Sequence, residues 1–94
     1  MEEINFSLVN GHYESDAIIA GKDNMVIHLK FQKSGLTMVD RSIDGTDWYR
    51  DGALVTSGYT HRTNFETTIC GVTEGQQIKL IFGEGVIPTN IQIL

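Results

Sequence analysis

Residues 25–31 read Met-Val-Ile-His-Leu-Lys-Phe, and their apolar side chains recur at every second position. Successive side chains of a β-strand point to opposite faces, so this alternation predicts a strand with one buried face. The buried face is predicted to carry Met25, Ile27, Leu29 and Phe31. On the opposite face, His28 is predicted to be a half-exposed structural residue.

The same alternation recurs along the chain in short runs that end at Gly, Asn and Asp. Pairs such as Asn10-Gly11, Asp44-Gly45 and Asp51-Gly52 supply the positive φ angles that tight connections need. Short strands separated by such turns are typical of a sandwich or barrel. The candidate strands are residues 3–9, 12–20, 25–32, 36–43, 47–50, 53–57, 65–70, 76–82 and 86–93.

These patterns predict an all-β fold, a single β-sandwich domain over residues 1–94 with about eight short antiparallel strands. The topology is predicted to be immunoglobulin-like or jelly-roll-like. Its core is predicted to include Ile27, Leu29, Phe31, Ile69, Ile78 and Leu80. A domain of this size is stable by only about 5–10 kcal/mol, and self-association often adds to such a margin.

Composition argues against two classes of partner. The net charge is −5, and the seven Lys and Arg residues are scattered along the chain. Nucleic acids and anionic membranes are bound by clustered basic residues, so neither is an expected partner. No run approaches the roughly 20 apolar residues that a membrane helix needs.

Cys70 is the only cysteine, so no disulfide can form within the chain. It is predicted to be a buried, inert small hydrophobe. The beginning of the chain, MEEINFSLV, has acidic residues where a signal peptide has basic ones. The sequence is therefore expected to be made in the cytoplasm without a signal peptide.

No catalytic site is predicted. The three histidines, His12, His28 and His61, stand in no recognisable nucleophile motif. The acidic residues of DRSIDGTDWYRDG, which are Asp40, Asp44, Asp47 and Asp51, are oxygen ligands of the kind that calcium prefers. Their spacing differs from a helix-loop-helix calcium loop, and turns explain them as well. We expect no metal and no cofactor.

Within that stretch, SIDGTDW (residues 42–48) resembles the Asp-box hairpin of sialidases and other β-propeller proteins, which runs S-x-D-x-G-x-x-W. This sequence lacks the residue between Asp and Gly. An Asp-box is a folding motif, so the resemblance implies no glycosidase activity. It implies that Asp44 and Gly45 form a turn and that Trp48 packs.

Two surfaces could serve binding. Trp48, Tyr49 and Tyr59 could stack on sugars, with Asp47, Asp51 and His61 as polar partners, although a role as a packing anchor is the preferred interpretation of Trp48. The C-terminal strand is predicted to be an edge of its sheet, because Pro88 lacks an amide hydrogen. This edge and the polar stretch 56–68 could form a protein interface, with a solvated loop as the alternative. Its predicted contact residues are Tyr59, His61, Arg62, Asn64, Pro88, Asn90 and Gln92.

Taken whole, the chain resembles the small β-sandwich accessory proteins of tailed bacteriophages, which are head-decoration and fibre-type modules. The features that carry the resemblance are its single-domain size, the SIDGTDW hairpin and the closing GEGVIPTNIQIL strand. The resemblance implies a non-enzymatic structural role in a virion, with several copies on a capsid or tail lattice. A carbohydrate-binding module is the alternative.

Overall fold

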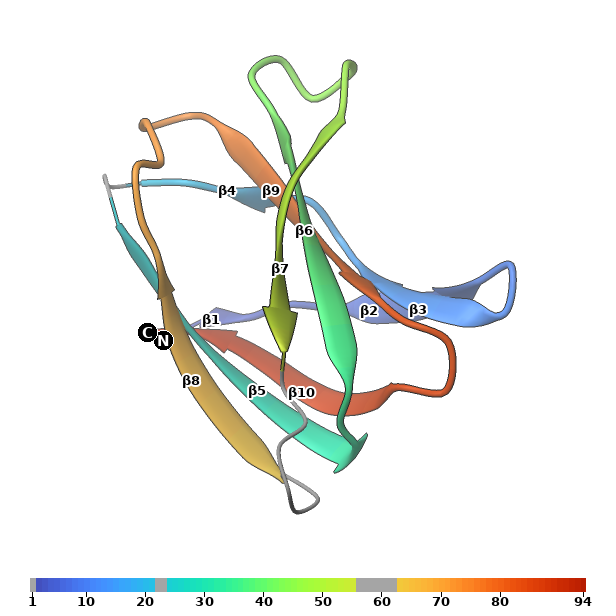
Figure 1. Cartoon of the computed structure of the whole chain (residues 1–94). Coiled ribbons are helices and arrows are strands. Elements are labelled where there is room, and N and C mark those ends of the chain that lie inside the picture. The colour runs from blue at the N-terminus through green and yellow to red at the C-terminus, as the bar shows by residue number, and fades with distance from the viewer. Residues whose placement is uncertain (1, 22–23, 56–62) are drawn as a thin grey trace.

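The computed structural model describes residues 2–21, 24–55 and 63–94, and within these ranges the chain forms two antiparallel sheets packed face to face (Figure 1). The prediction of an all-β sandwich is confirmed. The described ranges hold ten strands, two more than about eight predicted, and no helix long and apolar enough to cross a membrane.

The two sheets differ in size. The four-stranded sheet has the order β1 (Glu2–Glu3), β10 (Ile87–Ile93), β5 (Met25–Lys33) and β8 (Asn64–Ile69). The six-stranded sheet has the order β2 (Phe6–Val9), β3 (His12–Ser15), β9 (Gln77–Phe82), β6 (Leu36–Ser42) and β7 (Tyr49–Val55), and β4 (Ile18–Ile19) pairs with β9 beside β3.

The core lies between the sheets and takes side chains from both. All six residues predicted to face it are buried. Phe31 of the four-stranded sheet meets Phe82 of the six-stranded sheet edge to face, with ring centroids 6.0 Å apart. The buried apolar cluster consists of Ile18, Ala20, Met25, Ile27, Leu29, Phe31, Val39, Ile69, Val72, Ile78, Leu80, Phe82, Val86 and Ile91.

The first tight turn forms as predicted. Asn10 and Gly11 both have positive φ, 51° and 87°, as a two-residue type I′ hairpin requires. They join β2 to β3. The predicted strand 12–20 nevertheless breaks after Ser15, whose hydroxyl accepts a hydrogen bond from the Leu80 amide at 2.8 Å.

The predicted turn at Asp51-Gly52 is wrong, because β7 runs through it without interruption. Val39 pairs with Gly52 and Asp40 pairs with Arg50, so Asp51 is an extra residue in β7. Such a β-bulge bends a strand without ending it. The two predicted strands 47–50 and 53–57 are therefore represented by one strand, β7 (Tyr49–Val55), and residues 56 and 57 lie outside the described residues.

The prediction that the C-terminal strand is an edge is also wrong. β10 lies between β1 and β5, because the start of the chain pairs back onto its end, Glu2 with Ile93. The chain leaves this sheet after Ile4, so the predicted strand 3–9 divides into β1 and β2. Pro88 has no amide hydrogen and is accommodated at a register shift in β10.

Candidate functional site

The outer face of the four-stranded sheet is polar. Across this face, Gln92 of β10 lies opposite His28 of β5, and His28 lies opposite Glu66 of β8. The His28 Nε2 atom is 3.0 Å from the Asn64 Oδ1 atom, and its side chain is 27% exposed, as the sequence predicted for a half-exposed residue. The residues of this polar face are Glu3, His28, Lys30, Asn64, Glu66, Asn90 and Gln92.

The predicted contact residues separate into three groups. Asn64, Asn90 and Gln92 come from two strands and share the polar face, where the Asn90 Nδ2 group donates to the Glu3 carboxylate at 3.0 Å. Pro88 is buried opposite Phe31 in β5, so it does not reach this face. The remaining predictions, Tyr59, His61 and Arg62, lie outside the described residues.

Backbone hydrogen bonds show which groups of β8 point away from the sheet. The Leu94 amide donates to the Val26 carbonyl, and the Phe31 amide donates to the Thr63 carbonyl, each at 2.9 Å. Alternate residues of a strand bond to opposite neighbours. Odd-numbered residues of β5 therefore bond toward β8, and Thr67 of β8 bonds back toward Ile27. The backbone groups of Glu66 and Thr68 then point to the open side of β8.

β8 is also the most regular edge of the sandwich. Six consecutive pairs join it to β5 without a register shift, and its sequence, NFETTI, contains no Lys or Pro. Among the other outer strands described, β7 is bulged, and β1 and β2 are two and four residues long. Short strands, bulges, Lys and Pro are the usual protections of an edge. β8 has none of these protections.

The outer face of the six-stranded sheet carries a loop built on Asp44. The Asp44 Oδ1 atom accepts hydrogen bonds from the Thr46 and Asp47 amides at 2.9 and 3.0 Å, and from the Ser42 hydroxyl at 3.1 Å. These hydrogen bonds lower the pKa of the Asp44 carboxyl below its usual value, and the bond from the Asp47 amide has the largest effect. Gly45 has φ of 84°. The turn predicted for Asp44 and Gly45 is confirmed.

Trp48 closes this loop and faces a cleft. Its indole Nε1 group donates to the Gly45 carbonyl at 3.2 Å, which fixes the direction of the ring. The Lys79 Nζ atom lies 4.8 Å from the ring centroid, within the range of a cation–π contact. The cleft has a volume of about 760 Å³ and lies between the β2–β3 hairpin, β6, β9 and the start of β7.

Two polar pairs line the cleft. His12 Nε2 is 2.8 Å from Glu14 Oε2 on the hairpin, and the Arg50 Nε group donates to Asp40 Oδ1 at 2.5 Å across β6 and β7. The hydrogen bond to Asp40 raises the pKa of the Arg50 guanidinium. The cleft therefore contains an aromatic ring beside two pairs of polar side chains, and the contact within each pair holds its side chains in place.

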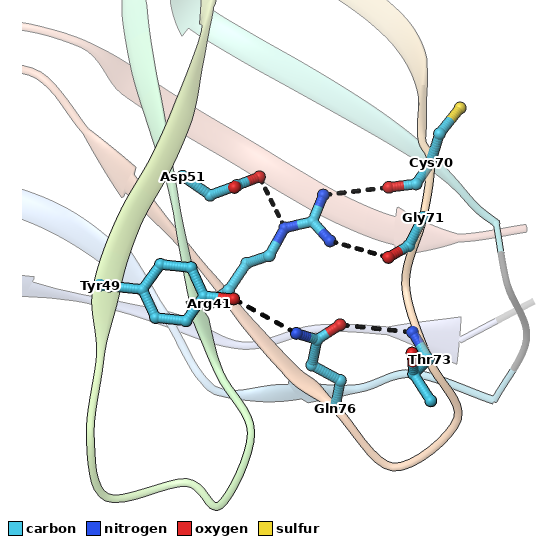
Figure 2. Close-up of polar contacts among 7 residues, drawn as sticks. All are labelled: Arg41, Tyr49, Asp51, Cys70, Gly71, Thr73 and Gln76. Carbon is cyan, nitrogen blue, oxygen red and sulfur yellow. Dashed lines mark hydrogen bonds and ion pairs between the residues drawn. The ribbon is translucent and has the colours of Figure 1, made fainter.

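Tyr49 does not join Trp48 in the cleft. Its hydroxyl accepts a hydrogen bond from the Gln76 Nε2 group at 3.4 Å, at the connection between β8 and β9 (Figure 2). The predicted sugar-stacking set is therefore divided. Trp48 lines the cleft, Tyr49 does not, and Tyr59 lies outside the described residues.

Arg41 ties the two sheets together at one end of the sandwich. Figure 2 shows its guanidinium between Asp51 of β7 and the backbone that follows β8. It donates to the carbonyls of Cys70 and Gly71 at 3.0 and 3.2 Å, and its Nε atom is 2.7 Å from Asp51 Oδ2. The bulge in β7 thus places Asp51 beside Arg41.

The prediction of a buried Cys70 is wrong. Cys70 is exposed, because Ile69 is the last residue of β8 and turns its own side chain into the core. The acidic residues of DRSIDGTDWYRDG do not converge either, since Asp40, Asp44 and Asp51 each bind a different internal partner. In the described part of the chain, no three His, Cys, Asp or Glu side chains are grouped to hold a metal.

Sequence reasoning missed the roles of Arg41 and of the polar cleft residues. The sequence gives no signal for Arg41, because the apolar residues of the predicted strand 36–43 fall on both of its faces. The polar residues of the cleft give no local signal beyond their place in alternating strands. The strand order of the sheet brings them together, and they are His12, Glu14, Arg50 and Lys79. No protein-family model, curated protein or solved structure matches the chain.

Proposed function

We propose that the chain is a non-enzymatic structural module that assembles with other protein subunits, as an accessory protein of a virion capsid or tail. The observation that supports this most is the open side of β8. There the Glu66 and Thr68 backbone groups lack a strand neighbour within the described residues. An extended segment of a partner subunit can pair with such an edge and lengthen the sheet.

The polar face gives this pairing its specificity. Asn64 and Glu66 project from β8 itself, and Asn90 and Gln92 lie on the same face two strands away. Main-chain bonds at an edge supply affinity without much selectivity, whereas side chains beside it select the partner. Asn and Gln suit this task because they both donate and accept hydrogen bonds.

The test is to replace Thr68 with Pro and with Ala. Proline removes the amide that points to the open side, and it leaves the bonds of Thr67 to β5 in place. Thr68→Ala keeps the amide and removes only the side chain. Sedimentation velocity over a concentration series measures self-assembly, and mass spectrometry of purified particles measures incorporation.

We expect T68A to assemble like the parent and T68P to remain a folded monomer that particles do not incorporate. Circular dichroism establishes that T68P is folded. Equal assembly of the two variants would contradict pairing at β8. A parent chain that stays monomeric at every concentration and is absent from purified particles would contradict the structural role itself.

A further inference from the structure

The cleft beside Trp48 lies on the other sheet from β8 and is a separate candidate site. Its volume of about 760 Å³ falls within the range of about 300–1,000 Å³ that is usual for small-molecule sites. An adjoining hollow of about 360 Å³ shares Glu14, Trp48 and Lys79 with it. Trp48 therefore borders two depressions that share three lining residues.

The chemistry of the lining combines apolar and hydrogen-bonding groups. Met38 and Ile81 lie opposite each other in the register of β6 and β9, and both line the cleft with Trp48. Sugar rings present C–H groups on one face and hydroxyl groups around the edge. Aromatic and aliphatic side chains pack on the first, and paired polar side chains bond the second.

The charges of the cleft favour a neutral ligand. Three acidic residues, Glu14, Asp40 and Glu84, line it together with Arg50 and Lys79. With His12 neutral, the net charge is about −1, which gives a phosphate or sulfate no excess of positive charge to bind. Asp40 and Arg50 also satisfy each other, as do His12 and Glu14. Each pair still has donors and acceptors for hydroxyl groups.

We infer that this cleft binds a neutral saccharide, with Trp48 packed against a sugar ring and the Asp40–Arg50 and His12–Glu14 pairs bonded to its hydroxyl groups. This inference is independent of the proposed assembly at β8, because the residues involved lie on a different sheet. A structural module with such a cleft attaches to a glycan surface with one face while its β8 edge holds the assembly.

The experiment uses the fluorescence of Trp48, the only tryptophan in the chain, as a direct reporter of the cleft. The probes are neutral trisaccharides of glucose, N-acetylglucosamine and galactose, together with a sulfated trisaccharide. We expect a saturable change in emission with at least one neutral probe and none with the sulfated one. Calorimetry gives the same affinity and also serves for variants that lack Trp48.

The expected effect of Trp48→Ala or Asp40→Asn is a loss of affinity of about tenfold or more, as for a central contact residue. D40N is included because it is a small change that should leave the fold intact even if W48A does not fold. Tyr49→Phe and T68P are matched controls away from the cleft and should bind like the parent. No saturable response to any neutral probe, preference for the sulfated probe, or parent-like affinity in both cleft variants would overturn the inference.

Discussion

The two sheets of this sandwich share one core and present very different outer faces. The four-stranded sheet ends at β8, a regular and open edge beside a polar face. The six-stranded sheet is overlaid by the Asp44 loop, and its own β2–β3 hairpin and Trp48 at the end of that loop border a cleft. Both sheets contribute apolar side chains to the core. The polar face is formed by residues within the strands, whereas the cleft also depends on the β2–β3 turn and the loop before β7.

The comparison indicates how a chain of 94 residues can accommodate the two proposed binding surfaces. A pleated strand points alternate residues inward, so each sheet contributes to the core with one face and leaves the other facing outward. Loss of the core should affect both surfaces, whereas changes outside the core should affect only one of them.

The largest effect is expected from the shared core. Leu29→Ala removes a fully buried side chain between the sheets and should lower the free energy of unfolding by about 2–5 kcal/mol. Lys30→Ala, the exposed neighbour on the same strand, should change it by less than about 0.5 kcal/mol. Urea unfolding followed by circular dichroism measures both. Similar losses for the two variants would contradict the assignment of Leu29 to the core face and Lys30 to the outer face.

A smaller effect is expected where Arg41 joins the sheets. Its side chain is 13% exposed, donates hydrogen bonds to two carbonyls and forms an ion pair with Asp51, so Arg41→Met should cost about 1–3 kcal/mol of unfolding free energy. Arg50→Met removes an ion pair from a side chain that is 54% exposed and should cost at most about 1 kcal/mol. If R50M is the more destabilised variant, Arg41 does not hold the sheets together.

The Asp44 loop should make the surroundings of Trp48 sensitive to acid. The pKa of Asp44 is lowered in the folded chain, so its carboxylate stabilises the loop at pH values above about 3.9, the usual pKa of Asp. That stabilisation is lost as the pH falls through the lower folded pKa. Trp48 emission should shift in that range, and the shift should be reduced in Asp44→Ala.

Asp47→Asn is the matched control, because the Asp47 amide, not its carboxylate, takes part in the loop. It should keep the acid transition of the parent. A transition that is unchanged in D44A would contradict its assignment to the loop.

The smallest effect is expected from calcium. Asp40, Asp44 and Asp51 are held by Arg50, the loop amides and Arg41. Coordination of an ion would break these contacts. The melting temperature should therefore be the same with millimolar calcium and with a chelator. A rise of several degrees in calcium would show that a native-state ion site exists.

Strand alternation was sufficient to predict the class of fold and the core, because side-chain period and burial are local properties of a sequence. It was not sufficient at Asp51-Gly52, where a pair typical of turns lies in a bulged strand. It also misplaced the edge, because the position of β10 depends on pairing with residues at the opposite end of the chain. Strand order is a long-range property.

The candidate surfaces also combine features that a local sequence pattern predicts with features that depend on long-range strand pairing. Alternation alone does not show that Asn64, Asn90 and Gln92 share one face of the sheet. That conclusion also requires the register of β8, β5 and β10. The SIDGTDW turn was predicted because its hydrogen bonds lie within seven residues. The cleft that Trp48 faces depends on a hairpin more than 30 positions earlier, and no local motif indicates it.

Amide hydrogen exchange within β8 tests the central claim, assembly through this edge, most directly. In the dispersed chain, the Glu66 and Thr68 amides should exchange quickly, and the Thr67 amide, bonded toward β5, should exchange slowly. In the assembled state, Glu66 and Thr68 should become as protected as Thr67. An assembly in which Glu66 and Thr68 exchange as quickly as in the dispersed chain would contradict pairing at β8.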